Sequence, residues 1–385
     1  MNRRQLLRVG GASALVLGAA GVGGYMALRG PGTGPATAPW RQAGGSFGDA
    51  RLDALAYAIL APNPHNKQPW RFTLEGEDTV IVHCDLGKRL PATDPYDRQI
   101  TIGFGAMIAL FQMAAEANGH IVTVDPFPEG SDVGTLDERP IARLALGNGG
   151  VQADPLFANV LNRHTNRAPF EDRAVDADDV AKIVDAGRRE DPNSSEPGSI
   201  LTPGDVAAVT AIADEGWRIE HGTPATLKES ADVTRIGNRA VTENPDGIAL
   251  QGAFFELLKR AGVLTQESMV TEGTTAWTTA RDGYLQLINS ARGFLTLTAA
   301  ENTRVGQLVT GEQWLRMHLK ATSLGIAYHP LSQVLQEFEE MAGPYGEIHE
   351  RLRPGGVVHM LVRIGYAPAP DPAPRWPLTA KLEGA

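Results

Sequence analysis

The sequence predicts an α+β fold that is present twice in one chain. Short alternating patterns, such as 79–84, occur beside long apolar helix patterns, of which 100–117 and 312–323 are the clearest. Segments 105–119 and 311–325 have the same length, and each begins and ends with glycine. Because internal similarity indicates repeated supersecondary structure, we expect a duplicated α+β unit.

Each half has its own expected helices and strands. In the first half these are a helix at 51–60, a strand at 79–84, a helix at 100–117 and a strand at 141–146. In the second half they are a helix at 177–188, a loop at 191–203, a helix at 206–221, a strand at 294–298, a helix at 312–323 and a strand at 357–366. The two longest helices are followed by Gly119 and Gly325, and glycine is common just beyond a helix end.

We divide the chain into one half at 50–153 and another at 154–385. Proline and glycine are frequent around 125–153, which favours a connector there. The second half contains an additional stretch, about 225–290, with little regular punctuation. Long insertions in compact domains are often functional, so this stretch is a candidate lid.

Composition and charge restrict the classes of partner. Lys and Arg total 35 against 45 Asp and Glu, so the formal net charge is −10. An acidic protein of this kind does not offer the basic face that nucleic acid requires. The single cysteine, Cys84, excludes an intramolecular disulfide and a cysteine-rich metal site, and the nine histidines lack metal-binding spacing. We therefore expect neither nucleic acid nor a bound metal.

The first 29 residues are expected to be an export signal or a membrane anchor. Arg3 and Arg4 precede an uncharged run at 9–28 that is rich in glycine. This pattern resembles a twin-arginine export signal, which implies a location in the periplasm or on the outer face of the cytoplasmic membrane. An ordinary N-terminal membrane helix is the alternative. Residues 30–49, rich in Gly, Pro and Ala, are expected to form a flexible linker.

The strongest functional signal is the segment 61–70, Ala-Pro-Asn-Pro-His-Asn-Lys-Gln-Pro-Trp. Its prolines fix the backbone, and its amide side chains can reach a flat heteroaromatic ring. The candidate cofactor-binding residues in it are Pro62, Asn63, Pro64, Asn66 and Gln68. A rigid polar loop that simply follows a helix is the plain alternative.

A second signal is the segment 163–167, Arg-His-Thr-Asn-Arg, just ahead of the first helix of the second half. Two arginines four residues apart, with a hydroxyl between them, can bind an anion. The candidate residues in it are Arg163, His164, Thr165 and Arg167. A solvated basic turn can have the same sequence.

Together these segments resemble the FMN-dependent nitroreductases, and in particular the double-domain, Acg-type branch of the nitroreductase superfamily. The segment 61–70 is similar to that family's Pro-Ser-Ser-x-Asn-x-Gln-Pro-Trp loop, with Asn63 and Pro64 in place of the two serines. The likeness extends over most of residues 50–380 and includes the strand end at 362–366 and Arg-Trp-Pro at 375–377.

The resemblance implies a role for each matching residue. Arg163 and Thr165 would contact the flavin phosphate and ribityl chain, and Arg167 would lie near the N1/O2 edge of the ring. Arg375 would be a second phosphate ligand. Three residues stand in the segment whose backbone faces flavin N5 in the family, where Glu-Gly is usual: Leu331, Ser332 and Gln333.

The implied function is the reduction of an electron-poor acceptor, a nitroaromatic or a quinone, by NAD(P)H through FMN. The alternative is a non-catalytic flavin storage or sequestration protein in which the stretch 225–290 covers the FMN. Only the first half has the loop and only the second half has the arginines. We therefore expect one FMN per chain and a monomer that acts as a pseudo-dimer, with no catalytic side chain assigned.

Overall fold

The computed structural model describes residues 34–132 and 134–384. The expected export signal at 1–29 lies outside these residues. The structure differs from the expected flexible linker over 34–49, because this range contains the short helices η1 (Pro35–Thr37) and α2 (Ala38–Gln42). Trp40 of α2 is buried in the main hydrophobic core, so packing fixes this segment in place.

The first half forms one four-stranded antiparallel sheet with two long helices. Its elements are α3 (Ala50–Ala58), β1 (Trp70–Glu75), β2 (Thr79–Cys84), α4 (Arg98–Ala117), β3 (His120–Pro126) and β4 (Ala142–Asn148). The strands lie in the order β1-β2-β4-β3. Trp70 is opposite Cys84 in the β1–β2 pair, and His120 is opposite Asn148 in the β3–β4 pair.

The second half repeats this arrangement. Its elements are α5 (Ala177–Ala186), β5 (Glu196–Ile200), β8 (Gly293–Ala299), α12 (Arg304–Ser323), β9 (Ala327–Pro330), α13 (Ala342–Leu352) and β10 (Val357–Gly365). The strands lie in the order β5-β8-β10-β9, so each strand has the neighbours of its counterpart in the first half. The α+β class is confirmed, and the repeated strand order fits a fused duplicate.

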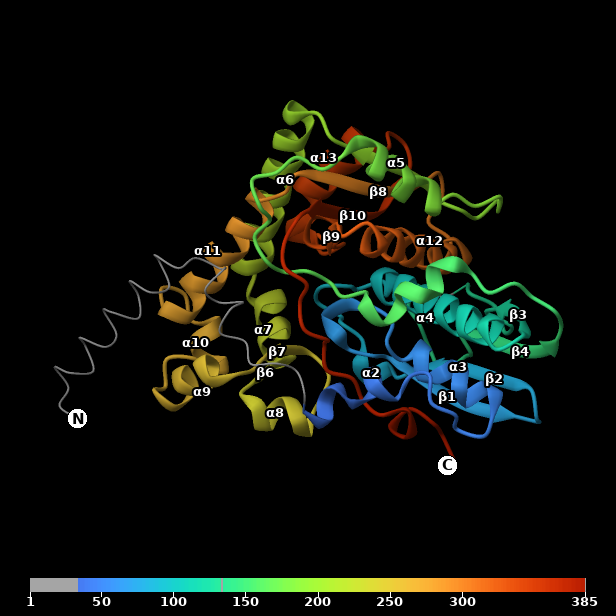
Figure 1. Ribbon diagram of the computed structural model, residues 1–385. Helices are drawn as coiled ribbons and strands as arrows, with labels where there is room; N and C mark the ends of the chain where they lie inside the picture. The colour runs from blue at the N-terminus through green and yellow to red at the C-terminus, as the bar shows by residue number, and fades with distance from the viewer. Residues whose placement is uncertain (1–33, 133, 385) are drawn as a thin grey trace.

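The two halves meet through α4 and α12, which lie side by side between the two sheets (Figure 1). A Cβ atom on Gly105 would overlap the carbonyl oxygen of Leu308, and a Cβ on Gly311 would overlap that of Ile102. Leu308 precedes Gly311 by three residues, as Ile102 precedes Gly105. The contacts at the helix crossing are therefore reciprocal, as they would be around a two-fold axis. Both positions require glycine because the two helix backbones touch.

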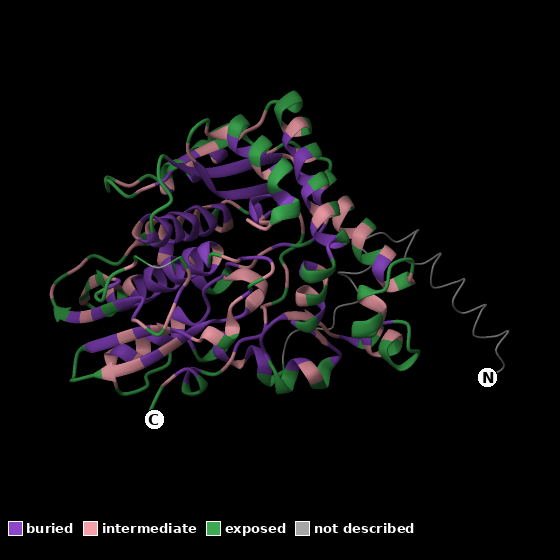
Figure 2. Ribbon diagram, turned by 180° about the vertical axis from the view of Figure 1, so that it is seen from behind, coloured by how far each residue is buried: buried purple, intermediate pink, exposed green. Residues whose placement is uncertain are grey.

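Figure 2 shows that α4, α12 and the adjoining strands are the most buried part of the molecule. By length and composition α4 could cross a membrane, but 83% of its most apolar window is buried inside the protein. Burial on all sides explains this composition, since a helix that contacts the core all round is apolar all round.

The chain between β5 and β8 forms a separate arm at one side of the molecule (Figure 1). Its elements are α6 (Pro203–Gly222), α7 (Pro224–Asp232), β6 (Thr234–Ile236), α8 (Asn238–Glu243), β7 (Ile248–Leu250), α9 (Ala253–Arg260), α10 (Gln266–Val270) and α11 (Thr275–Asn289). A small hydrophobic cluster around Ile236, Phe255 and Leu264 supports it. We call residues 224–289 the inserted segment; the domain boundaries drawn from the sequence stay a prediction.

Several predicted elements need correction. The predicted loop at 191–203 is wrong, because it contains β5; an edge strand tolerates Pro197 and Gly198. The helix predicted at 312–323 begins at Arg304. Outside the inserted segment, β1, β3, β9 and α13 were not predicted. The other predicted helices and strands are confirmed within a few residues. The 3-10 helices outside the N-terminal segment are η2 (Pro64–Asn66), η3 (Leu86–Lys88), η4 (Pro155–Asn162), η5 (Gln333–Leu335), η6 (Glu339–Met341) and η7 (Leu378–Ala380).

Candidate functional site

Three segments that are far apart in the sequence meet at the carbonyl groups that follow α3. Arg163 Nη2 donates to the Leu60 oxygen at 3.1 Å. Arg375 Nη2 donates to the same oxygen at 3.0 Å and to the Ala61 oxygen at 3.1 Å. The sequence motifs at 61–70 and 163–167 and the C-terminal Arg375 therefore form one site.

Arg163 is buried with few partners. Its side chain is close to His318 of α12, with 3.4 Å between Nη1 and Nδ1, and its Nε has no hydrogen-bond partner among the described residues. Burial lowers the pKa of Arg163 to about 10. Within residues 34–132 and 134–384, no carboxylate forms an ion pair with it.

Arg375 has a similar environment. Its Nη1 donates to Asn66 Oδ1 at 2.6 Å, while its Nε has no partner in the described part of the chain. Burial lowers the pKa of Arg375 to about 9, and the charges of Arg163 and Arg167 act in the same direction. No ion pair to Arg375 is present among the described residues.

Two buried guanidinium groups without a carboxylate are unfavourable unless an anion joins them, because an uncompensated buried charge is costly. Each guanidinium also has an Nε–H donor without a partner among the described residues, and an unpaired buried donor costs further free energy. A phosphate group supplies the negative charge and the acceptor oxygens that these donors lack. The residues present thus fit an anionic ligand with a phosphate.

The loop that follows α3 has an unusual backbone. His65, Asn66 and Gln68 have φ values of 45°, 53° and 50°, a region that non-glycine residues rarely adopt. Asn63 closes the loop, since its Oδ1 accepts a hydrogen bond from the Gln68 amide at 2.7 Å. Strained backbone of this kind is concentrated at functional sites, where surrounding contacts maintain it.

Two of the three side-chain amides of the loop are held by other segments. Asn66 Nδ2 donates to the Pro374 oxygen at 3.0 Å, and Gln68 Oε1 accepts from the Trp376 amide at 2.9 Å. Pro62 is buried beneath the loop, and Pro64 begins η2. All five predicted loop residues therefore lie at the junction of the halves and the C-terminal tail.

The segment 163–167 is only partly buried. Burial lowers the pKa of His164 to about 3, and its ring lies 4.6 Å from that of Trp40. Thr165 is half-buried and Arg167 is exposed. Burial, and after it the charge of Arg167, lowers the pKa of His65 to about 4, which places Arg167 close to the strained loop.

The third predicted group, residues 331–333, directly follows β9. Leu331 is buried, with its amide bonded to the Leu361 oxygen at 2.8 Å, and Ser332 begins η5. Gln333 Nε2 donates to the hydroxyl of Tyr284 at 3.0 Å. Among the described residues this group forms no hydrogen bond to Arg163 or Arg375, so no such bond joins it to the arginine pair.

Sequence reasoning missed several residues of the site. Trp40 stands between the arginines, with its ring centroid 5.9 Å from the Arg163 guanidinium carbon and 5.4 Å from that of Arg375. His318 contacts Arg163 from α12. A lone tryptophan in a Gly- and Pro-rich stretch and a lone histidine on an apolar helix were the available signals.

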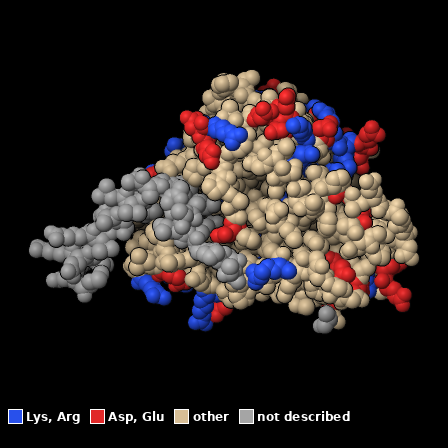
Figure 3. Space-filling view, viewed as in Figure 1, with Lys and Arg blue, Asp and Glu red and all other residues tan. Residues whose placement is uncertain are grey.

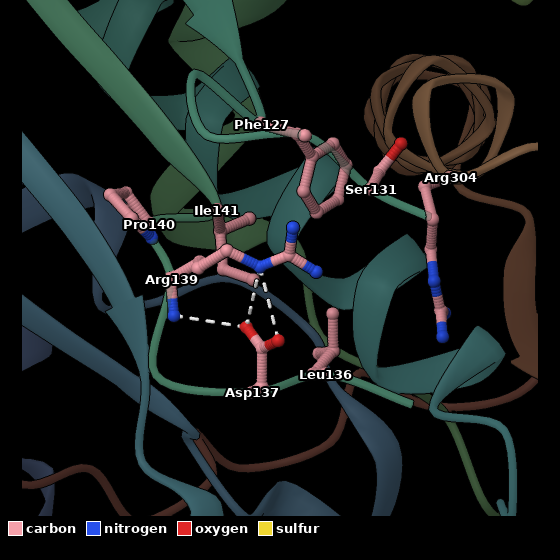
Figure 4. Close-up of a pocket in the computed structure, with 9 residues that line it drawn as sticks. Phe127, Ser131, Leu136, Asp137, Arg139, Pro140, Ile141 and Arg304 are labelled. Carbon is pink, nitrogen blue, oxygen red and sulfur yellow. Dashed lines mark hydrogen bonds and ion pairs between the residues drawn. The ribbon is translucent and has the colours of Figure 1, made fainter. Parts of the chain in front are cut away.

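Two cavities in the described part of the chain lie away from the predicted cofactor site. The one in Figure 4, between Phe127, Arg139 and Arg304, has a volume of about 10 Å³ and holds no more than one water. An open hollow of about 530 Å³ lies over α5 and β5. None of the predicted cofactor-binding residues lines either.

On the face in Figure 3 charged side chains lie mostly at the periphery, in keeping with the burial of Arg163 and Arg375.

Comparison with known proteins gives relatives over most of the chain, although no family model matches. A Mycobacterium tuberculosis protein named "Putative NAD(P)H nitroreductase acg" is 26% identical over 346 residues, covering 86% of this chain and 94% of that protein. A crystal structure titled as a "putative nitroreductase" from Anabaena variabilis covers 87% of this chain and 89% of its own at a TM-score of 0.46 and 11% identity. An FMN-dependent nitroreductase from Mycobacterium smegmatis in complex with NADPH covers 58% of this chain and 95% of its own, with a TM-score of 0.33 and 16% identity. The chain is thus similar in sequence, over most of its length, to proteins named as NAD(P)H nitroreductases.

Proposed function

We propose that the chain binds one FMN without a covalent link and is an NAD(P)H-dependent oxidoreductase. The observation that carries this proposal is the buried pair Arg163 and Arg375, which has no carboxylate partner among the described residues. The sequence relative named as an NAD(P)H nitroreductase supports the same conclusion.

The residues of the site divide between the two ends of such a cofactor. Arg163 and Arg375 would hold the phosphate, whose charge is close to −2. The amides of Asn63, Asn66 and Gln68 would bind the ring. When bound, FMN supplies hydride chemistry; the protein binds and orients it and adjusts its charge distribution. Arg167, beside the loop, would stabilise negative charge at the ring.

The proposed acceptor is an electron-poor molecule of the nitroaromatic or quinone type. The family resemblance supports a position for residues 331–333 beside the reactive edge of the ring. In the structure Gln333 of this group hydrogen-bonds to the Tyr284 hydroxyl. Tyr284 is half-buried, and desolvation raises its pKa to about 12, so its hydroxyl stays protonated.

A second candidate function is flavin storage or sequestration without turnover. The observation that favours it is the contact between the inserted segment and the loop: Gln68 Nε2 donates to the Pro245 oxygen at 2.8 Å. An inserted segment that stays closed over the loop would exclude NAD(P)H and an acceptor from the flavin.

The test is an absorption spectrum of the purified full-length protein, acid release of the flavin, and anaerobic addition of NAD(P)H. We expect a flavin spectrum, close to one FMN per chain, and bleaching on addition of NAD(P)H with recovery when a quinone is added. A flavin that is present but does not bleach favours storage. Colourless protein that takes up no added FMN contradicts both functions.

We further propose export through a twin-arginine route, because an FMN-binding protein would need to fold before it crosses the membrane. Arg3→Lys combined with Arg4→Lys keeps the charge and removes the guanidinium pair. We expect the double variant to accumulate inside the cell with FMN bound. Delivery equal to that of the parent, measured by fractionation, would leave only the simple membrane anchor.

A further inference from the structure

The inserted segment contacts the strained loop through Pro245 and Gly247, the two neighbours of Asp246. The Pro245 oxygen accepts from Gln68 Nε2 at 2.8 Å, and the Gly247 amide donates to the Asn66 oxygen at 3.1 Å. These two contacts hold two of the loop residues that have positive φ, and the inserted segment has no counterpart between β1 and β2.

Asp246, between these contacts, joins three regions of the molecule. Its carboxylate accepts from Lys88 of the first half, from Arg235 Nη2 of β6 at 2.7 Å, and from Trp376 Nε1 of the C-terminal tail at 3.1 Å. Its side chain is only 1% exposed. Burial opposes ionisation, but the bonds from Lys88, Trp376 and Arg235 outweigh it and lower the pKa of Asp246 to about 2.

The backbone next to Asp246 is also restricted. Gly247 has φ +74°, and a Cβ there would overlap the Val233 carbonyl oxygen. The turn at 245–247 is therefore fixed by the Val233 carbonyl, which leaves no room for a side chain at Gly247, and by the hydrogen bonds of the Asp246 carboxylate. Trp376 extends this restraint to the loop, because its amide donates to Gln68 Oε1.

We propose that Asp246 is a positioning residue for the cofactor loop: it fixes the turn 245–247 and Trp376, which keep Asn66 and Gln68 in the geometry that binds FMN. This proposal rests on the proposed function. Positive φ costs about 1–2 kcal/mol per non-glycine residue, so the loop needs such restraint. A loop that adopts the competent geometry only part of the time binds its ligand more weakly by that fraction.

The test compares Asp246→Asn with Glu243→Gln in the full-length protein. Glu243 lies three residues away, and it pairs with Arg239 in an exposed ion pair, so it controls for removal of one negative charge from this segment. Hydrogen–deuterium exchange of peptides that cover 62–70, measured without FMN, reports the loop alone. The rate of FMN release reports the consequence for the cofactor.

We expect faster exchange of the loop in Asp246→Asn but not in Glu243→Gln. We expect FMN release to accelerate on the order of 10- to 100-fold, as for the loss of hydrogen bonds to a charged group. Unchanged loop exchange, or release as slow as in wild type, overturns the proposal. If the wild type binds no FMN the proposed function fails, and the exchange measurement still decides whether Asp246 holds the loop.

A milder variant guards against misfolding. Trp376→Phe removes only the indole hydrogen bond to Asp246 and keeps the amide that contacts Gln68. Its loop exchange and FMN release should lie between those of wild type and Asp246→Asn. Values equal to wild type in this variant contradict a role for Asp246 that acts through the tail.

Discussion

The two halves of the molecule are alike where they meet and different where the site forms. The crossing of α4 and α12 has reciprocal contacts through Gly105 and Gly311, and both sheets have the same strand order. Around the site the halves are unlike: one supplies the loop after α3, and the other supplies Arg163 and the inserted segment. Duplication thus gives a symmetric framework, and divergence of its two copies gives a single asymmetric site.

Three buried arginines illustrate the same division. Arg98, in the framework, pairs with Glu337, with 3.0 Å between Nε and Oε2, and it also donates to the His359 oxygen. Arg163 and Arg375, in the site, bond only to neutral groups of the described chain and leave their Nε atoms without partners. A carboxylate thus compensates the buried charge of Arg98. Buried Arg363 of β10 bonds only to neutral groups, but none of its donors lacks a partner among the described residues. Arg163 and Arg375 differ from both, because each leaves a buried donor for a ligand.

The largest effect should come from the symmetric crossing. Gly105→Ala and Gly311→Ala would each push α4 and α12 apart, because the new methyl group overlaps a facing carbonyl oxygen. We expect each to lower the free energy of unfolding by about 3 kcal/mol or more, at the upper end for overpacked cores. Urea denaturation measures both.

Gly346→Ala on α13 is the matched control, since a Cβ there has open space. It should raise the free energy of unfolding by about 0.5–1 kcal/mol, because alanine is the better helix residue. A large difference between the Gly105 and Gly311 variants would show that the crossing is not equivalent in the two halves.

The next effect distinguishes site from framework. Arg163→Ala should weaken FMN binding by about 2–4 kcal/mol, through loss of a charge-assisted contact. Without FMN the same variant should unfold no more easily than wild type, because it removes an uncompensated buried charge. Isothermal titration and urea denaturation give the two quantities.

Arg98→Ala is the contrast, because it leaves Glu337 without its partner. It should lower the free energy of unfolding by about 3 kcal/mol, whether or not FMN is present. If Arg163→Ala lost as much stability without FMN as Arg98→Ala does, the difference between the two kinds of arginine would disappear.

The sequence predicts the framework better than the site. Strand β2 and helix α4 follow from periodicity, and Gly119 and Gly325 end their helices with φ of +85° and +69° as expected. Strand β5 could not be read from Glu-Pro-Gly-Ser-Ile, because its place at a sheet edge, and not its composition, makes it a strand.

The site residues divide in the same way. The loop at 61–70 and the arginines at 163–167 are local motifs, so sequence alone identifies them. Trp40, His318 and Asp246 reach the site only because distant segments fold together, and no motif around them indicates a ligand. The beginning of α12 was missed because Gly306, Gln307 and Thr310 lack an apolar pattern; contact with α4 and polar partners bury them.

The smallest of these effects concerns the arm between β5 and β8, which the first half does not have. Glu220 of α6 is 3% exposed, and its Oε2 has no partner among the described residues. Burial raises the pKa of Glu220 to about 8, a hydrogen bond to Gln336 acts in the opposite direction, and Glu229 adds to the increase. Since this pKa lies above the unfolded value of 4.5, the folded state binds more protons between those two pH values.

The contribution of protonated Glu220 to the free energy of unfolding is therefore fully present below pH 4.5. It is lost as the pH rises from there through about 8. Glu220→Gln removes this dependence because its amide does not ionise. At pH 9 we expect the variant to be more stable than wild type on the order of 2 kcal/mol, since internal relaxation lowers the full cost of desolvation. Urea denaturation from pH 5 to pH 9 measures the slope, and exposed Glu215 on the same helix provides the Glu→Gln control. Parallel pH profiles for wild type and Glu220→Gln would mean that Glu220 is ionised in the folded protein, and the arm would then hold a compensating donor for its carboxylate.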